Sequence, residues 1–307
     1  MQKKAFEQGK WENNYQMGIE EIDRQHAKLF AMARKIVQLH QDDPFSLQSN
    51  TFVGVEGVKF LKNYTIQHFA TEEAYMKKAG YSAYVEHKRE HDKFRDEVIP
   101  SLERYLEESN YSQKAVNRLT GVVLTWLVNH VAREDMAIVG RAVSRPRKAV
   151  ETAKLEETIR NVTVDLFSSV FHGIVPEVVN SSYSGEDFGR AVCYEKSYYS
   201  LETRQKMTFR MAAEEKMVFC LAGQLLADAV SRMEELTYFL VEEFCSVLIQ
   251  NLDPILIRQS HECAQAESRF LTEEQFGEAL EARMPEFSSL FETGIGKFAL
   301  CIDRRAF

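Results

Sequence analysis

Five of the eight histidines in this chain fall into one pattern that also contains two carboxylates. In chain order the pattern reads His26, His68 with Glu72, His87 with His91, and His130 with Asp135. These residues are spread over four segments whose apolar residues recur at helical spacing. Imidazole together with carboxylate suits iron, and two carboxylates that can bridge suit a pair of irons better than one. The pattern therefore predicts an iron site enclosed by a bundle of helices.

The spacing inside the pattern agrees with this prediction, with one exception. His68 and Glu72 are four residues apart and share a helix face, as do the two histidines of the third segment. His130 and Asp135 are five apart, which is about 140° on an ideal helix. They point the same way only if Asp135 reaches around or the helix is distorted there.

Each piece of the pattern also has a simpler explanation when taken alone. A single histidine such as His26 is more often a core residue than a metal ligand, and two histidines at HxxxH spacing are a common accident. An HxxxE pair can be an exposed helix pair. Together, however, these groups could not stay buried without partners, and a metal ion makes the arrangement tolerable.

The first half of the chain is expected to form four helices, at about residues 19–40, 52–78, 82 to beyond Pro100, and 112–139. Pro44 and Gly80 mark the ends of the first two, and the third continues past Pro100 or kinks there. Short connections make consecutive helices antiparallel neighbours, which predicts an all-α up-down-up-down four-helix bundle.

The second half of the chain predicts an α+β domain with an antiparallel sheet. We expect helices at 155–174, 214–229 and 233–251, strands at 190–199 and 206–211, a short β-rich run at 254–258 and a terminal hairpin at 287–302. The basic, proline-containing stretch 144–148 is the best candidate for a linker. The predicted division is a first domain at 1–142, a linker at 143–152 and a second domain at 153–307.

Composition restricts the class of protein. The chain has 307 residues, enough for two cores, and its net charge of −8 argues against nucleic acid as the main partner. No apolar run approaches a membrane span, and the first residues lack the apolar region of a signal peptide. All five cysteines lie in the second half without a CxxC pair, which favours reduced residues in a cytoplasmic protein.

The residues around the pattern resemble those of the bacterial hemerythrins over about residues 10–140. The shared residues are Met17-Gly18-Ile19, Ile22 to His26, His68-Phe69 with Glu72-Glu73 and Met76, His87 and His91 with Phe94, and Trp126-Leu127 before His130 and Asp135. All seven ligand positions of that family are filled. The resemblance implies a non-haem di-iron centre that binds dioxygen.

By this resemblance, one iron takes His87, His91 and His130, the other takes His26 and His68, and Glu72 and Asp135 bridge them beside an oxo or hydroxo group. Dioxygen is then expected at the iron with only two imidazoles, because one of its positions stays open. Ferritin-like di-iron oxidases use mostly carboxylates, so the imidazole-rich set favours a binder. Ile22 and Trp126 could wall the open position, although plain core packing is the alternative for Trp126.

The second half is similar in element order to the CheX and CheC phosphatases of chemotaxis. Those enzymes act on a response regulator with an acidic residue and an asparagine three positions later on a long helix. Glu243 fits the acid, but Ser246 stands where the asparagine is expected, which puts catalysis in doubt. The alternative for Glu242 and Glu243 is a solvated helix face.

The sequence thus predicts a cytoplasmic two-domain protein that binds dioxygen reversibly at two iron ions and acts as an oxygen or redox sensor through its second domain. Oxygen storage or delivery is one alternative, and an oxygen-gated response-regulator phosphatase is another. The expected partners are dioxygen and a response regulator or another chemotaxis protein. Whether the chain forms a homodimer stays open.

Overall fold

The computed structural model describes residues 15–42, 47–141, 155–171, 173–185, 189–200, 204–226, 230–256 and 265–306. They group into two compact units, which are described separately below. The first unit comprises residues 1–144, 225–228 and 233–243, and the second comprises 145–224, 229–232 and 244–307. The expected linker at 143–152 lies outside the described residues, so the predicted division there stays a prediction.

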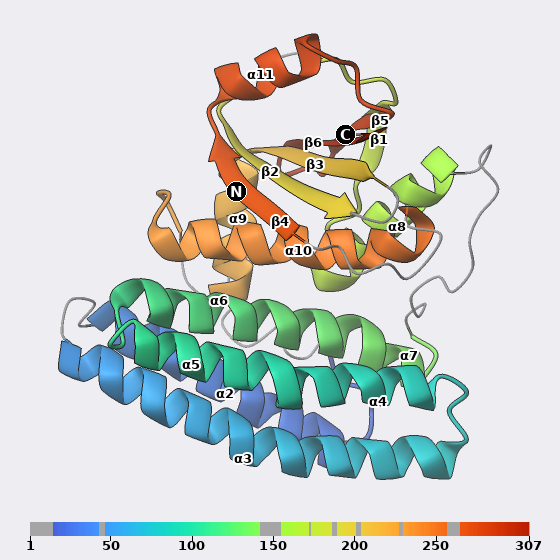
Figure 1. The fold of residues 1–307 in the computed structure, drawn as a ribbon. Coiled ribbons are helices and arrows are strands. Elements are labelled where there is room, and N and C mark those ends of the chain that lie inside the picture. The colour runs from blue at the N-terminus through green and yellow to red at the C-terminus, as the bar shows by residue number, and fades with distance from the viewer. Residues whose placement is uncertain are drawn as a thin grey trace. The chain divides into compact units, whose positions relative to one another are not determined.

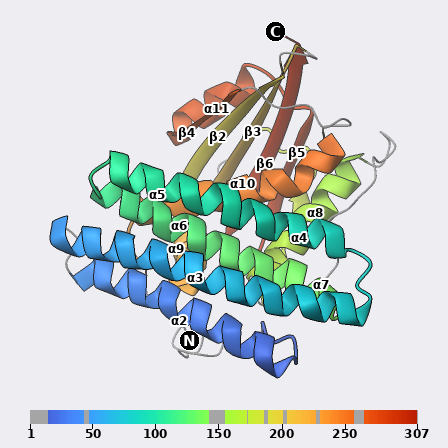
Figure 2. The same ribbon diagram turned by 60° about the horizontal axis from the view of Figure 1, so that its bottom comes forward.

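The first unit contains four helical runs that lie side by side (Figures 1 and 2). The runs are α2 (Glu20–Asp42), α3 (Leu47–Ala79), the series α4 (Tyr84–Lys93), η1 (Phe94–Val98) and α5 (Ile99–Glu108), and the series α6 (Gln113–Asn129), η2 (His130–Asp135) and α7 (Met136–Ile138). Successive runs are antiparallel. The predicted up-down-up-down bundle is therefore confirmed.

Local signals in the sequence explain where these helices begin and end. Gly80 takes a positive φ of 65°, and the amide of Tyr81 donates to the Met76 carbonyl, which closes the C-terminus of α3. Ser112 caps the start of α6 by accepting a hydrogen bond from the Ala115 amide. These two ends belong to the second and fourth helical runs, which carry four of the seven predicted ligands.

The third run passes Pro100 without ending. Residues 94–98 form a π-helical turn, η1, and α5 follows with Pro100 in its first turn. In a regular α-helix the Pro100 ring would clash with the carbonyl of Asp96, four residues earlier. Asp96 lies inside the widened turn, which accommodates the proline. The prediction that the helix continues beyond Pro100 is therefore confirmed.

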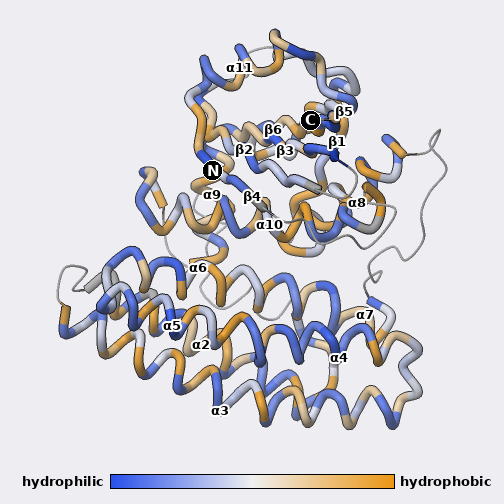
Figure 3. Tube along the Cα trace, in the orientation of Figure 1, coloured by the Kyte–Doolittle hydropathy of each residue, from blue (hydrophilic) through white to orange (hydrophobic). Residues whose placement is uncertain are grey.

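The bundle core consists of apolar side chains from all four runs. Its members include Ile36, Val58, Leu61, Phe69, Phe94, Leu102, Val116, Leu119 and Val123. Apolar and polar residues alternate along each bundle helix, as expected for amphipathic helices (Figure 3). This core fixes the helices on which the candidate site is built.

The second unit contains a six-stranded antiparallel sheet in the order β1-β5-β6-β3-β2-β4. Its strands are β1 (Glu177–Asn180), β2 (Ala191–Ser200), β3 (Gln205–Glu214), β4 (Gln265–Leu271), β5 (Phe287–Glu292) and β6 (Lys297–Ala306). The helices of this half are α8 (Leu155–Val170), α9 (Glu215–Leu226), α10 (Glu235–Leu256) and α11 (Glu273–Glu281), although the last two residues of α9 and the part of α10 up to Glu243 are grouped with the first unit. The predicted α+β class, the antiparallel sheet and the terminal hairpin are confirmed.

Side chains alternate between the two faces of this sheet. Phe298 of β6 stacks on Phe167 of α8 with ring centroids 4.4 Å apart. The next residue, Ala299, instead belongs to a cluster with Phe276 and Leu280 of α11. Because successive strand residues point to opposite faces, α8 and α11 cover opposite faces of the sheet. Figure 1 shows the same layering of helix, sheet and helix.

The predicted β-rich run at 254–258 is wrong over its first residues, because α10 continues to Leu256. Leu248, Leu252 and Leu256 are all buried and recur every four residues, so this apolar stretch extends the buried face of a helix. The strands β1 and β4 and the helix α11 were not predicted from the sequence. Among the described residues, no helix combines the length and apolar character needed to cross a bilayer.

Candidate metal centre

The structure brings all seven predicted ligands together inside the bundle. His26 comes from α2, His68 and Glu72 from α3, His87 and His91 from α4, and His130 and Asp135 from η2. Every one of these side chains is buried, and Glu72, His91 and Asp135 have no exposed surface. They form two groups, each able to hold a metal ion.

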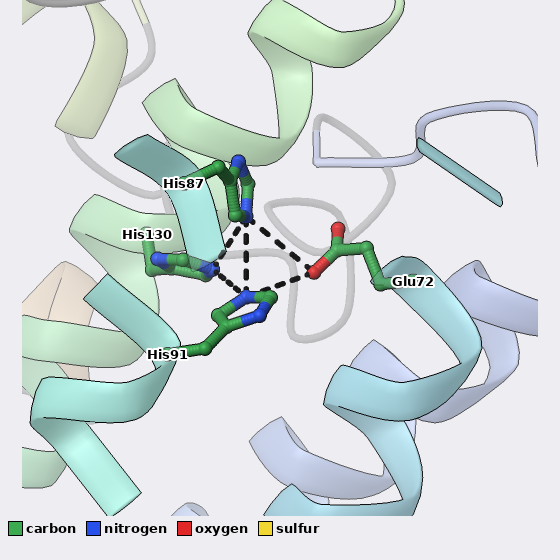
Figure 4. A group of neighbouring side chains, drawn as sticks. All are labelled: Glu72, His87, His91 and His130. Atoms are coloured by element: carbon green, nitrogen blue, oxygen red, sulfur yellow. Dashed lines mark hydrogen bonds and ion pairs between the residues drawn. The ribbon is translucent and has the colours of Figure 1, made fainter. Parts of the chain in front are cut away.

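The first group consists of Glu72, His87, His91 and His130, which point toward one another in Figure 4. The Nε2 atoms of the three imidazoles lie 2.9, 3.1 and 3.2 Å from one another. The Glu72 Oε2 atom lies 3.2 Å from His91 Nε2 and 3.6 Å from His87 Nε2. Three ring nitrogens and one carboxylate oxygen therefore converge on one point.

The distances between these nitrogens indicate the geometry that they would offer a metal ion. With metal–nitrogen bonds of roughly 2.1 Å, neighbouring ligands are about 3.0 Å apart on an octahedron and about 3.4 Å apart on a tetrahedron. The measured separations of 2.9–3.2 Å match one triangular face of an octahedron. Octahedral coordination by imidazole and carboxylate fits iron better than a structural zinc site.

The second group consists of His26, His68 and Asp135, and Asp135 connects it to the first. The Asp135 Oδ2 atom lies 3.1 Å from His26 Nε2. The other oxygen, Oδ1, lies 3.1 Å from His130 Nε2 and 3.3 Å from His87 Nε2. The two oxygens of one carboxylate thus face the two groups, which is how a bridging carboxylate is placed.

The distortion anticipated between His130 and Asp135 is present. Residues 130–135 form the π-helical turn η2, in which the backbone pairs residues five apart instead of four. This turn brings both side chains to the same side of the fourth run, where each reaches the centre. The π-helical turn therefore explains how two residues five apart both face the centre.

Several polar atoms of the site lack hydrogen-bond partners among the described residues. Both oxygens of Glu72, both oxygens of Asp135 and both ring nitrogens of His26 are fully buried without one. Their contacts with neighbouring imidazoles are short but do not have hydrogen-bond alignment. A buried polar atom without a partner is costly, so a cation held between these atoms fits the site.

The charges of the site perturb its pKa values strongly. Burial and the nearby Asp135 carboxylate raise the pKa of Glu72, but close contacts with His87 and His91 outweigh them and hold it at about 2. Burial lowers the pKa of His87, but Asp135 and Glu72 outweigh it and raise this pKa to about 10. Burial lowers the pKa of His68 to about 3. Both carboxylates are therefore anionic at neutral pH, as metal ligands must be.

Two residues that sequence reasoning did not single out orient the imidazoles from outside. Gln25 Oε1 lies 3.0 Å from His68 Nδ1, and Glu73 Oε1 lies 3.3 Å from His91 Nδ1. A ring that donates from Nδ1 presents the lone pair of Nε2 to the centre. Each residue is next to a ligand in the sequence, but neighbouring residues of a helix point in different directions, so adjacency alone gave only a weak signal.

The two residues predicted to wall an oxygen pocket are close to the site. Ile22 is buried on α2, one turn before His26. Trp126 stacks on His130 with ring centroids 4.4 Å apart and an interplanar angle of 12°. It also lines a small apolar cavity together with Leu29 and Thr65. Their role around oxygen stays a prediction.

The candidate phosphatase position lies on α10 of the second half. Glu243 and Ser246 are both half-buried and are three residues apart on this helix. Ser246 Oγ accepts a hydrogen bond of 2.9 Å from Lys196 Nζ on β2. The hydroxyl that stands in the place expected for an asparagine amide is thus engaged by a lysine.

Comparison with known proteins assigns the first half. Residues 17–142 match the family described as the hemerythrin HHE cation binding domain. The bacteriohemerythrin of Clostridium acetobutylicum is 31% identical over 127 residues, which cover 41% of this chain and 94% of that protein. The family match over residues 17–142 includes all seven residues of the two ligand groups.

Two solved structures are similar to about half of the chain. One is the chemotaxis protein CheX from Vibrio vulnificus, with 7% identity and a TM-score of 0.38 over 50% of this chain and 99% of that one. The other is a CheC-like superfamily protein from Shewanella sp. PV-4, with 10% identity and a TM-score of 0.39 over 51% of this chain and 100% of that one.

Proposed function

This chain belongs to the hemerythrin family through residues 17–142, and from that membership we propose that it binds dioxygen reversibly at a pair of non-haem iron ions. In this proposal the group of three imidazoles holds one iron, and His26 with His68 holds the other. Glu72 and Asp135 are shared between them. The iron count and the sharing of both carboxylates are part of the proposal.

The observation that supports this function most is the position of Asp135. Its two oxygens face different ligand groups at 3.1 Å, one toward His26 and the other toward His130. A single metal ion would use only one of these directions. A carboxylate placed between two imidazole groups favours two metal ions close together.

A pair of ferrous ions would supply the two electrons that reversible binding of dioxygen requires. The chain supplies the surroundings of the ions. Five imidazoles bind as neutral ligands, and the outward hydrogen bonds of His68 and His91 hold two of the rings in place. The burial of every ligand side chain excludes bulk water from the site, which limits the supply of protons there.

Oxygen sensing is the fuller form of the proposal. The second unit has a sheet and a core of its own, which simple oxygen storage does not require. The order of its helices and strands, which resembles that of the CheX and CheC phosphatases, favours a response regulator or another chemotaxis protein as the partner. We assign it protein contact instead of phosphatase chemistry, because Ser246 carries a hydroxyl already bound by Lys196. The four described cysteines form no disulfide, which supports a cytoplasmic location.

An oxygen titration of the full-length protein tests the proposal. Iron-loaded, reduced protein under argon is expected to contain two irons per chain and to take up one dioxygen per pair, followed by its optical spectrum. Removal of oxygen should restore the original spectrum. A His172→Ala variant, which changes a histidine outside the pattern, should behave like the unmodified chain. One iron per chain, or oxidation that argon does not reverse, would contradict the proposal.

Sensing and storage differ in their need for a partner. A sensor should retain a response regulator or a chemotaxis protein through several washes when purified from its own cells, and the amount retained should depend on oxygen. A storage protein should retain neither. Release of phosphate from a phosphorylated response regulator by the purified chain would instead favour the phosphatase alternative.

A further inference from the structure

The two halves of the metal centre have different outer hydrogen-bond partners. His91 faces the Glu73 carboxylate at 3.3 Å, whereas His68 faces the Gln25 carboxamide at 3.0 Å. In both cases the ring nitrogen turned away from the centre meets an oxygen. One of these oxygens carries a negative charge and the other is neutral.

The orientation of Gln25 is fixed by its amide nitrogen. This Nε2 donates to Glu21 Oε1 at 3.0 Å and to Thr71 Oγ1 at 3.2 Å. Turning the amide over would break both hydrogen bonds and place a donor against His68. His68 therefore meets the neutral oxygen of Gln25. Because this oxygen can only accept a hydrogen bond, the Nδ1 atom of His68 must be protonated.

Glu73 is held in place by a chain of charges that runs to the protein surface. Lys88 Nζ lies 3.9 Å from Glu73 Oε2 and donates to both oxygens of Asp92 at 2.6 and 2.7 Å. Arg95 Nη2 donates to Asp92 at 2.9 Å. The Glu73 side chain is only 14% exposed, so its charge acts on His91 with little screening by water.

We propose that Glu73 and Gln25 make the two halves of the centre electronically unequal, with Glu73 lowering the reduction potential of the metal held by His91. A carboxylate draws the Nδ1 proton more strongly than a neutral amide does, which makes the imidazole a stronger electron donor through Nε2. A stronger donor stabilises the higher charge of an oxidised metal. Glu73 is thus a positioning residue for His91, and this inference rests on the proposed di-iron centre.

Redox titration of the full-length, iron-loaded protein tests the inference. Glu73→Gln keeps the shape of the side chain and removes its charge, so the first oxidation should move to a more positive potential. Gln25→Glu adds a charge beside His68 and should move the reduction potential of the iron held by His68 in the negative direction. Mössbauer spectra of the half-oxidised variant that carries both Glu73→Gln and Gln25→Glu should show that the iron held by His68 now oxidises first. Glu103→Gln, a carboxylate paired with Lys62 on the same bundle, is the matched control.

A second variant keeps the test decisive if Glu73→Gln loads iron poorly. Lys88→Met leaves Glu73 on His91 but removes the cation beside it, and should move the first oxidation to a more negative potential. Lys77→Met removes a similar charge that lies over the Tyr84 ring instead, and serves as its control. A Glu73→Gln protein with two irons and unchanged potentials would overturn the inference, as would equal potentials in the two lysine variants. Absence of paired iron in the unmodified chain would overturn the proposed function itself.

Discussion

His130 and Asp135 meet at the metal centre, with Nε2 and Oδ1 3.1 Å apart, because the six residues from one to the other form a π-helical turn. On an ideal α-helix, residues five apart diverge by about 140°. The i→i+5 bonding of a π turn places them roughly one turn apart on the same side. The wider turn is therefore what allows one helix to supply both a terminal imidazole and the carboxylate shared by the two groups.

Replacing Asp135 by Asn should remove iron from both groups at once. The amide keeps the size of the side chain but carries no charge. Its nitrogen also replaces one carboxylate oxygen with a hydrogen-bond donor, which repels a cation. The iron content of the full-length protein should fall from two to well below one per chain after desalting. Glu103→Gln should retain two irons. Two irons in the Asp135→Asn protein would show that Asp135 is not shared.

His68→Ala and His130→Ala should differ in how much iron they retain. Loss of His68 leaves its group with one imidazole and Asp135, whereas loss of His130 leaves two imidazoles and Glu72. Removal of one ligand from the weaker group should therefore cost more, and His68→Ala should lose one iron more readily. Iron analysis and the oxygenated spectrum of each full-length variant check this. A normal oxygenated spectrum for His68→Ala would contradict the assignment of the open position.

The first half of the fold was predictable because two signals agreed there. The apolar spacing gave the four helices, and Gly80 and Ser112 marked ends that the structure shows as caps. The ligands could be found because imidazole is rare and its spacing matches a helix turn. The irregular spacing from His130 to Asp135 left two possibilities open, a long reach of Asp135 or a distorted helix, and the structure shows the distortion.

The second half was harder to predict because its signals are short and ambiguous. The strand β1 has four residues and three of them are exposed, so it shows no alternating pattern. The run at 254–258 is apolar and begins with a proline, which predicts a β-rich segment, but α10 continues to Leu256 and residues 257–258 lie outside the described residues. The roles of Gln25 and Glu73 could not be predicted either, because they depend on contacts between separate helices.

Replacing Trp126 should lower the stability of the bundle and weaken the packing that holds the His130 ring in place. The Trp126 ring stacks on Phe94 at 3.7 Å and on His130 at 4.4 Å, so it fills the space between them. Trp126→Ala should destabilise the metal-free protein by about 3 kcal/mol, whereas Trp126→Phe keeps an aromatic ring and should cost about 1 kcal/mol. Denaturant unfolding followed by helix content measures both. Faster loss of iron from the Trp126→Ala variant would support the prediction. Equal stability of the two variants would contradict it.

Binding of iron to the metal-free protein should release protons. The pKa of His87, raised to about 10 by Asp135 and Glu72, leaves this ring charged at neutral pH, and a metal must displace its proton. The apparent affinity for ferrous iron should therefore rise with pH, by about tenfold per unit for one displaced proton. Calorimetry under argon in two buffers of different protonation enthalpy counts the protons. Zero release at pH 7 would contradict the prediction.

The same shift fixes the sign of the pH dependence of stability without metal. A pKa raised on folding stabilises the fold fully below the unfolded value of 6.5, and this contribution is lost as the pH rises through about 10. The metal-free protein should therefore lose stability between these limits, and a His87→Gln variant should lose less. Denaturant midpoints at several pH values measure the difference. An equal loss in both proteins would rule out His87 as the cause.

Oxygen should change the behaviour of the second unit if the chain is a sensor. Such an effect corresponds to a coupling free energy of about 1–3 kcal/mol between the metal centre and the second unit. The fourth helical run carries both His130 and Asp135 and ends only a few residues before the predicted linker, so a shift of this run is the shortest route along the chain. Hydrogen exchange over residues 155–306 should differ between the diferrous and the oxygenated full-length protein, and the difference should disappear in His130→Ala. Exchange that is identical in the two states, with and without a chemotaxis partner, would make oxygen storage the better explanation.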